Sequence, residues 1–438
     1  MTRLQTFRWL AALGLAAAAT PLPLQAQDTA HVVIVSTTDI HGHISGWDFI
    51  EGRPFPGGLS RAGTVVDSLR ARYPGQVVLV DAGDVLAGDP FDTYFATHPR
   101  TPHPALEIMD AMEYDAIVPG NHEFNYGFEY FQQSYRGQNL RPVCANCILP
   151  GAGYNGADSL MFAPYITVPR GRVRVAIAGL TTPGSMVWDG EHLRGKLQVR
   201  PVGDRSTLFR TMRTEADLVV ALIHSGMDGA ASYDTTGVGD ENVAASLALG
   251  TSKPDVVVVG HSHREMRDSV INGVHFVQPK NWAQSLSVLH LSLRRVGARW
   301  QVAEARGELV PLANVPESGR LARRLDPLVS AVRYWAEEIV GYASGPLEAS
   351  AARTGATPLT AWMGEMMRRA ARADLAATAA FSTRRGLPDG DIRRNDIFGI
   401  YPYENTLRGV RITGAQLREY LEQTSQYYVL GADNKLAV

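Results

Sequence analysis

Five short polar clusters in this 438-residue chain hold the side chains that could carry chemistry. They supply imidazole, carboxylate and amide groups without thiolate, a set of ligands that suits zinc, manganese, iron or cobalt. Taken singly, each residue is better explained as a helix cap or a surface residue. Five clusters of the same chemistry are much harder to explain in that way. The candidate metal ligands are Asp39, His41, Asp84, Asn121, His224, His261 and His263.

The number of candidate ligands predicts two metal ions, because seven exceed the three or four ligands of a single catalytic zinc. Two ions ~3.5 to 4 Å apart need a carboxylate that can bridge them. Asp84, in a tight Ala-Gly-Asp turn, is the expected bridge. Gly83 and Gly120 each precede a candidate ligand and are expected to let the backbone turn sharply.

Each cluster directly follows a short apolar run, and these runs predict the elements that position the ligands. Runs of valine, isoleucine, leucine and alanine without polar alternation are typical of strands buried on both faces. Segment 58–75, with apolar residues at helical spacing, predicts a helical crossover. The fold class is therefore α/β, in which ligands gather at the carboxyl ends of strands. The five segments are 31–43, 76–90, 115–127, 217–228 and 255–265, and a sixth, 173–182, ends in hydroxyl groups.

The ordered motifs DIH, GD, GNHE, a lone histidine and GHSH make residues 31–300 resemble the calcineurin-like metallophosphoesterases. The resemblance implies a sheet sandwich flanked by helices and a phosphoester hydrolase with two divalent ions. One ion would be held by Asp39, His41 and His263, the other by Asn121, His224 and His261, and Asp84 would join both. His122 would stabilise the transition state or protonate the leaving oxygen, while Glu123 is expected to be structural.

Asn125 is informative about the substrate, because the secreted 5′-nucleotidase group that the chain resembles has aspartate there. Asparagine hydrogen bonds without charge, so His122 should be a weaker base, although Asn125 could also be a simple turn residue. Segments 120–127, 183–189 and 278–293 resemble instead the 2′,3′-cyclic-nucleotide 2′-phosphodiesterase/3′-nucleotidase branch.

We therefore expect hydrolysis of 2′,3′-cyclic nucleotides to 3′-nucleotides, and then to nucleoside and phosphate. The alternatives are a 5′-nucleotidase or nucleotide-sugar hydrolase, or a nucleotide-binding protein without catalysis. The formal net charge of −2 argues against binding to polymeric nucleic acid, so the expected partner is a small nucleotide. The oligomeric state stays open.

The sequence after a Pro-containing linker near 309–320 resembles the smaller α/β substrate-binding domain of the same group. A helix is predicted to begin with Thr357 as its N-cap, and a buried strand is predicted from about 375. Candidate substrate residues are Tyr403, which matches the base-stacking position, and Arg384 and Arg385, whose loop could equally be a solvated one. Because relatives in this family continue past 438, this domain is expected to be truncated.

The chain is thus divided into a signal peptide (1–26), a catalytic domain (28–312), a linker and connecting helix (313–345) and the substrate domain (346–438). The first segment has a positive start, an apolar run and a small-residue cleavage site, which predicts a periplasmic or secreted protein. Its apolar run of roughly 10 residues is far shorter than the ~20 that a membrane anchor needs.

Cys144 and Cys147 are the two cysteines of the chain. An oxidising compartment favours a disulfide, but an extended segment would place their Cα atoms ~10 Å apart, beyond disulfide reach. A zinc site would need two more ligands nearby. We therefore predict unpaired structural cysteines, with a local turn that joins them as the alternative.

Overall fold

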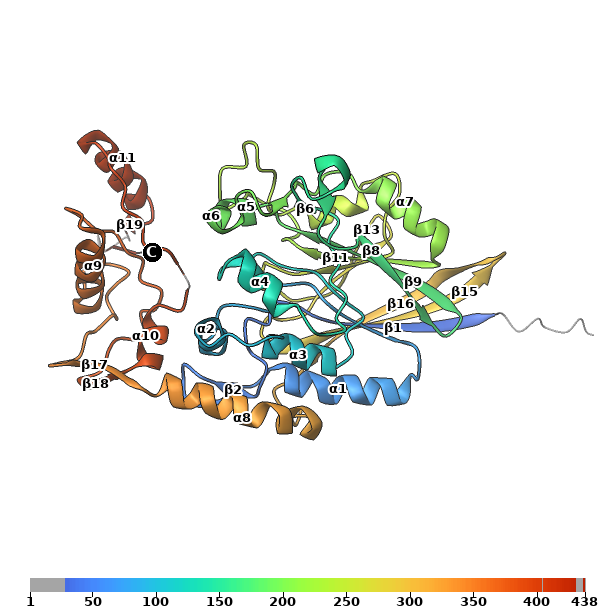
Figure 1. The fold of residues 1–438 in the computed structure, drawn as a ribbon, viewed down its shortest axis with the longest axis horizontal. Coiled ribbons are helices and arrows are strands. Elements are labelled where there is room, and N and C mark those ends of the chain that lie inside the picture. Colours follow the sequence, from blue (N-terminus) through green and yellow to red (C-terminus); the bar gives the residue numbers. More distant parts are fainter. Residues whose placement is uncertain (1–27, 404, 431–435, 438) are drawn as a thin grey trace, which may run out of the picture.

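The computed structural model describes residues 28–403, 405–430 and 436–437, so the predicted signal peptide lies outside the described residues. Two β-sheets face each other, and helices cover their outer faces (Figure 1). The first sheet has the order β16 (Arg299–Pro311), β15 (Ser285–Val296), β1 (Thr29–Thr37), β4 (Val77–Asp81) and β5 (Ala116–Ile117). The second has the order β13 (Met266–Ile271), β14 (Val274–Gln278), β12 (Val256–Val259), β11 (Leu218–His224), β9 (Val173–Thr181) and β8 (Tyr165–Arg170). The predicted α/β sandwich is confirmed.

The five apolar runs form β1, β4, β5, β11 and β12, as predicted. β-Branched side chains dominate them, and every residue of β11 is buried. β5 is short because Pro119, two residues beyond it, has no N–H group to extend the ladder. Strands β1, β4 and β5 run parallel, as do β9, β11, β12 and β14. Their carboxyl ends therefore lie along one edge of each sheet.

Apolar side chains fill three layers of this sandwich. Between the sheets, Val78 of β4 and Val220 of β11 belong to one buried cluster. The outer face of the first sheet is covered by α1 (Leu59–Arg72), α2 (Pro90–Thr97), α3 (Pro104–Ala111) and α8 (Gly319–Ala336). The outer face of the second sheet packs against α7 (Ser206–Glu215) through Phe209 and Met212. Each such side chain contributes roughly 1.5 to 3 kcal/mol of stability when fully buried. This packing fixes the positions of the strand ends.

The remaining elements of the sandwich region are short. They are β2 (Trp47–Asp48), β3 (Arg53–Pro54), α4 (Phe128–Ser134), β6 (Cys147–Leu149), β7 (Ser159–Leu160), α5 (Ser185–Trp188), α6 (Gly190–Leu193) and β10 (Gln198–Val199). Three 3₁₀ turns cover His122–Phe124, Tyr154–Gly156 and Ala244–Ala248. Within the described ranges, no helix has the length and apolar character that a membrane crossing requires.

A second group of elements follows α8 and lies apart from the sandwich in Figure 1. It comprises β17 (Ile339–Ala343), α9 (Pro358–Ala371), β18 (Gly390–Arg393), α10 (Arg394–Ile400), α11 (Gly414–Ser425), β19 (Val429–Leu430) and β20 (Leu436–Ala437). Helix α9 begins as predicted, because the Thr357 side chain accepts a hydrogen bond from the Thr360 N–H. The core of this group is small, and α11 buries none of its residues.

The predicted strand from about residue 375 is wrong. Residues 375–386 have no strand, and the side chain of Leu375 is 63% exposed. Within the described part of this region, β17 pairs with β18 in a two-stranded sheet, and this segment pairs with neither strand. The run is rich in alanine, which has a low preference for strands, so without a neighbouring ladder it stays irregular.

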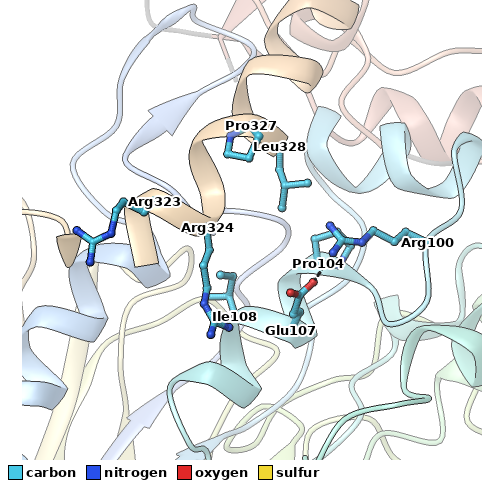
Figure 2. Close-up of a pocket in the computed structure, with 8 residues that line it drawn as sticks. All are labelled: Arg100, Pro104, Glu107, Ile108, Arg323, Arg324, Pro327 and Leu328. Carbon is cyan, nitrogen blue, oxygen red and sulfur yellow. Dashed lines mark ion pairs between the residues drawn. The ribbon is translucent and has the colours of Figure 1, made fainter. Parts of the chain in front are cut away.

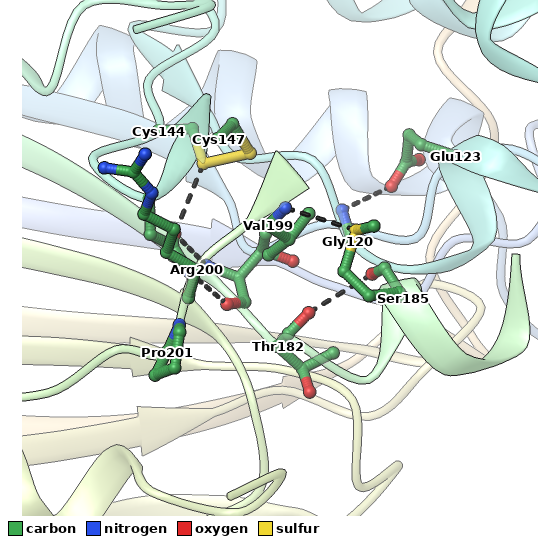
Figure 3. The surroundings of a disulfide bond; sticks show 12 residues. Gly120, Glu123, Cys144, Cys147, Thr182, Ser185, Val199, Arg200 and Pro201 are labelled. Carbon is green, nitrogen blue, oxygen red and sulfur yellow. Dashed lines mark hydrogen bonds between the residues drawn. A yellow bond between two sulfur atoms is a disulfide. The ribbon is translucent and has the colours of Figure 1, made fainter. Parts of the chain in front are cut away.

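The prediction of unpaired cysteines is also wrong, because Cys144 and Cys147 form a disulfide (Figure 3). A tight turn brings their Cα atoms to 5.6 Å, so the alternative of a local turn is correct. Asn146 anchors this turn: its Nδ2 donates to the carbonyl oxygens of Thr181 and Arg200, both at 2.7 Å. Both sulfur-bearing side chains are fully buried in an apolar cluster that includes Phe124.

Candidate metal and catalytic site

All seven candidate ligands lie where parallel strands end. Asp39 and His41 follow β1, and Asp84 follows β4. Asn121 follows β5, His224 is the last residue of β11, and His261 and His263 follow β12. The two sheets meet here, since the Asp39 carboxylate accepts a hydrogen bond from the His261 N–H at 3.0 Å. The structure therefore brings together the residues that the sequence singled out.

Five of the seven have a positive φ, which residues other than glycine rarely adopt. They are Asp39 (52°), His41 (47°), Asp84 (59°), His261 (73°) and His263 (52°). Each such conformation costs of order 1 to 3 kcal/mol and persists only where the surrounding structure imposes it. Strain concentrated on these residues is typical of a functional site.

The two glycines next to ligands serve different purposes. Gly83 has a φ of 95°, so it supplies the sharp turn that was predicted. Gly120 does not have a positive φ; a Cβ atom there would lie 2.6 Å from the backbone nitrogen of Asp84. Gly120 is therefore needed because the loops after β4 and β5 approach each other closely there. The prediction that Gly120 provides a sharp turn was wrong.

One group of donors consists of Asp39, His41 and His263, whose ligand atoms lie within 4.8 Å of one another. The Nε2 atoms of His41 and His263 are 3.1 Å apart, and His263 Nε2 is 3.4 Å from Asp39 Oδ1. His41 Nδ1 donates to the carbonyl oxygen of Ala87 at 2.8 Å, which leaves Nε2 as the free lone pair. Burial lowers the pKa of His41 to about 3, so the ring is neutral, as a metal ligand must be.

A second group consists of Asp84, His224 and His261, again within 4.8 Å, with Asn121 beside them. His224 Nε2 lies 2.9 Å from Asp84 Oδ2 and 3.1 Å from Asn121 Oδ1. His224 Nδ1 donates to the carbonyl oxygen of Ala82 at 2.7 Å. Asp84 Oδ2 is also 3.8 Å from His41 Nε2, so this carboxylate reaches both groups.

The charges of the site fit divalent cations. Burial opposes ionisation of Asp84, but the charges of His224 and His122 outweigh it, so the pKa of Asp84 lies well below its ordinary value. Burial likewise opposes protonation of His224, but the Asp84 carboxylate raises the pKa of His224 to about 10. Buried carboxylates thus require positive charge at this edge, which a divalent ion on the nitrogen and oxygen donors would supply.

Glu123 has a structural role, as its position outside the ligand set suggested. Its carboxylate accepts hydrogen bonds from the N–H groups of Asp84 (3.0 Å), Val85 (2.7 Å), Leu86 (3.1 Å) and Gly120 (2.5 Å). Figure 3 shows the bond to Gly120. Burial, reinforced by the charge of Asp84, raises the pKa of Glu123 to about 6. This one side chain ties the loop after β4 to the loop after β5.

Two supporting residues were not identified from the sequence. Glu241 Oε1 lies 2.8 Å from His261 Nε2, and this hydrogen bond lowers the pKa of Glu241. Lys280 Nζ donates to the carbonyl oxygen of His263 at 2.9 Å. Such partners orient ligand histidines. Lys280 lies within the 278–293 resemblance, which was a usable signal, whereas Glu241 has no motif around it.

His122 adjoins the ligands without belonging to either of the two expected sets. Its N–H donates to Asp84 Oδ1 at 2.8 Å, and its ring lies with His41 and Asp84 in a third group of donors within 4.8 Å. His122 Nδ1 is 2.6 Å from Asn125 Oδ1, so Asn125 does contact the histidine. Asn125 Nδ2 in turn lies 3.1 Å from both carboxylate oxygens of Asp189, a residue that was not among the candidates.

The candidate substrate residues lie in the C-terminal group of elements. Tyr403 is 54% exposed, and its ring centroid is 5.0 Å from that of Phe381. Arg385 forms an ion pair with Glu51 of the sandwich region, and the Arg384 N–H donates to Ser382 Oγ at 3.2 Å. Among the described residues, their hydrogen bonds, ion pairs and ring contacts involve none of the seven candidate ligands.

A separate hollow of about 340 Å³ lies between α3 and α8 (Figure 2). Arg100 and Glu107 form an ion pair of 2.9 Å at its wall, and Arg323 and Arg324 of α8 also line it. None of the candidate site residues lines this hollow, so it is not the candidate metal site.

Comparison with known families matches two stretches of the chain. Residues 32–265 match the calcineurin-like phosphoesterase family, and residues 339–437 match the 5′-nucleotidase C-terminal domain. The first match contains all seven candidate ligands and His122.

Known relatives are similar over most of the chain. The trifunctional nucleotide phosphoesterase protein YfkN of Bacillus subtilis is 25% identical over 92% of this chain, which spans 31% of that protein. The 2′,3′-cyclic-nucleotide 2′-phosphodiesterase/3′-nucleotidase of Haemophilus influenzae is 26% identical over 89% of this chain, which spans 66% of that enzyme. A crystal structure of the calcineurin-like phosphoesterase YfkN superposes with a TM-score of 0.62 at 26% identity, covering 70% of this chain and 99% of that one.

Proposed function

The chain belongs to the calcineurin-like phosphoesterase family, and from that premise we propose that it hydrolyses 2′,3′-cyclic nucleotides to 3′-nucleotides and then to nucleoside and phosphate. As a member of this family it is a phosphoester hydrolase that depends on two divalent metal ions. The convergence of both donor groups on Asp84 carries the two-metal hydrolysis, and the cyclic-nucleotide relatives support the choice of substrate. The predicted signal peptide supports a periplasmic or secreted location.

Within this proposal the donors divide as the family pattern implies. Asp39, His41 and His263 would hold one ion, Asn121, His224 and His261 would hold the other, and Asp84 would contribute to both. The distances support this division, because each set lies together and Asp84 contacts a histidine of each. The bound ions would neutralise charge on the phosphoryl oxygens and lower the pKa of an attacking water.

His122 handles the leaving oxygen in this scheme. Its Nδ1 donates to Asn125 Oδ1, so Nε2 is the nitrogen that exchanges a proton with the departing ribose oxygen. Asn125 supplies a neutral acceptor at the position where the 5′-nucleotidase group has aspartate, so the ring has no carboxylate as its direct Nδ1 partner. The contact between His122 and Asn125, together with the cyclic-nucleotide relatives, supports cyclic and 3′-nucleotides as the substrates.

The C-terminal group of elements is proposed to bind the nucleoside part of the substrate. The match of residues 339–437 to a 5′-nucleotidase C-terminal domain supports a separate C-terminal domain. The boundaries near 312 and 346 are part of the proposal. Tyr403 offers an exposed aromatic face for stacking on a base. Arg384 and Arg385 are the proposed anion contacts, and Arg385 would first have to leave Glu51.

A comparison of three substrates tests this proposal. Phosphate and nucleoside release would be measured from 2′,3′-cyclic AMP, 3′-AMP and 5′-AMP, with manganese or zinc and with a chelator. The proposal expects chelator-sensitive turnover that favours the cyclic and 3′ substrates. A preference for 5′-AMP would favour the 5′-nucleotidase alternative, to which the C-terminal family match also points. Nucleotide binding without turnover would favour a non-catalytic binding protein.

A further inference from the structure

We propose that Asp189 is a positioning residue for catalysis, which fixes the orientation of His122 by holding the Asn125 side chain between them. The inference rests on the proposed function, because it assumes that His122 acts on the leaving group. Asp189 comes from the short α5–α6 region, 64 residues beyond Asn125 in the chain.

The hydrogen-bond chemistry of the three side chains admits one arrangement. An ionised carboxylate can only accept, so the Asn125 amide must turn its NH₂ group toward Asp189. Its Nδ2 lies 3.1 Å from both Asp189 oxygens, which fits a shared contact with an ionised carboxylate. Asn125 Oδ1 must then face His122, 2.6 Å from Nδ1. The Nδ1–H of His122 is therefore held toward Asn125, and Nε2 is the nitrogen left to pass a proton to the leaving oxygen.

Asp189 is itself firmly placed. The side chain is 6% exposed, its N–H donates to the Ser185 carbonyl oxygen at 3.0 Å, and its carbonyl oxygen accepts from the His192 N–H at 2.9 Å. Burial raises the pKa of Asp189, and the hydrogen bond from Asn125 opposes part of that effect. A buried carboxylate is costly, so the contact with Asn125 is a place where that cost is offset.

The preceding residue touches the other half of the site. The Trp188 ring centroid lies 5.7 Å from that of His261 and 5.4 Å from that of Tyr233. Residues 188 and 189 thus contact a candidate metal ligand and the partner of His122. This segment supports the site from the second sheet, and Asp189 supplies its charged contact.

An exchange of the two groups separates this role from a structural one. Asn125→Asp would place two carboxylates within hydrogen-bond distance of each other, and like charges that share a site repel. Asp189→Asn in that background restores one carboxylate and one amide in reversed order. In this double variant the His122 Nδ1–H donates to the carboxylate of residue 125, and the amide of residue 189 donates to that same carboxylate.

The experiment measures kcat and KM for the substrate that the wild type turns over fastest, with metal content and thermal unfolding for each variant. Asp189→Ala is expected to lower kcat about 10- to 100-fold with KM and metal content little changed. Asn125→Asp is expected to lose at least as much, and the double variant to recover about 10-fold or more relative to Asn125→Asp. Arg194→Ala, an exposed residue directly after α6, is the control and should keep the wild-type kcat.

Either of two results would overturn the inference: wild-type kcat in Asp189→Ala, or a double variant no better than Asn125→Asp. If Asp189→Ala fails to fold, the comparison of Asn125→Asp with the double variant still decides. A wild type that turns over no phosphoester would contradict the proposed function instead, so the two failures are distinguishable.

Discussion

The edge of the sandwich that holds the candidate ligands and the C-terminal group that holds the candidate substrate residues are built in opposite ways. At the edge, five of the seven candidate ligands are buried, and five of the seven have a positive φ. In the C-terminal group, Tyr403 is half exposed and α11 buries no residue. Bond cleavage requires donors that do not move, whereas base stacking tolerates adjustable contacts.

The junction between the two regions is narrow. Trp335, near the end of α8, lies 5.6 Å from Tyr94 of α2 and 5.9 Å from Phe398 of α10, measured between ring centroids. The ion pairs of Arg385 with Glu51 and of Arg408 with Glu191 also connect the regions. Exposed pairs of this kind contribute about 0 to 1 kcal/mol each. A substitution in one region should therefore change the properties of that region and leave those of the other region unchanged.

The largest effect is expected at Asp84, the residue common to both donor groups. Asp84→Ala removes the carboxylate that lies 2.9 Å from His224 and 3.8 Å from His41. Loss of the bridge removes several kcal/mol of charge stabilisation, so kcat/KM should fall by ~10³ or more. Metal content should fall with it, measured by elemental analysis.

Asp326→Ala on the exposed face of α8 is the matched control and should retain metal and activity. If Asp84→Ala kept wild-type metal content and hydrolysis, the bridging role of Asp84 would be wrong.

A smaller effect is expected at Glu123, which supports the same edge without facing the substrate. Glu123→Gln replaces an acceptor of four backbone N–H groups with a side chain that has one acceptor oxygen. Activity should fall ~10- to 100-fold, and the free energy of unfolding by about 1 to 3 kcal/mol. Urea unfolding and initial rates measure both. A variant that loses stability but keeps full activity would show that catalysis does not require a rigid edge, which would contradict the contrast between the two regions.

Acid should weaken the sandwich through a group that the C-terminal region lacks. His103 Nδ1 accepts from the Ala105 N–H at the start of α3, and burial, with Arg100, lowers the pKa of His103 to about 3. The unfolded chain, with a histidine pKa near 6.5, binds this proton first, so stability falls as pH drops from about 6.5 to about 3. In the described C-terminal residues, shifted pKa values belong to the exposed pair Glu365 and Arg368.

His103→Asn keeps a capping acceptor that does not titrate. Between pH 7 and pH 5 the variant should lose about 2 kcal/mol less stability than the wild type, measured by urea unfolding at both values. His98→Asn, on an exposed residue, should follow the wild type. An unchanged pH dependence in His103→Asn would show that this ring does not carry the effect.

The smallest effect is expected at Tyr403. Tyr403→Ala should raise KM for a nucleotide by up to ~10-fold, because an aromatic stack contributes about 0.5 to 1.5 kcal/mol. Hydrolysis of an aryl phosphate ester without a base should not change. Tyr420→Ala on α11, similarly exposed, is the control. Equal changes for both substrates would remove the proposed role in base binding.

The same contrast explains which features could be predicted from the sequence. The candidate ligands could be found because each lies at or just beyond the end of one of five strands, so local sequence carries the signal. Glu241 and Asp189 were not predicted because they reach the site only through tertiary contacts with His261 and Asn125. No local pattern encodes those distances.

The two wrong predictions of local structure, the unpaired cysteines and the strand after 375, have the same origin. The turn that joins Cys144 to Cys147 depends on the Asn146 side chain and on backbone carbonyl groups of residues 181 and 200. The alanine-rich run after 375 resembles a strand until the absence of a pairing partner in the described C-terminal sheet is known. Apolar composition alone does not supply a neighbouring ladder.

The two-metal site is tested by metal content and hydrolysis, measured on the same preparation before and after chelation. We predict about two divalent ions per chain, loss of phosphoester hydrolysis when they are removed, and recovery of both when manganese or zinc is restored. Hydrolysis that persists in the metal-free chain would contradict this prediction, as would an active chain that binds no metal.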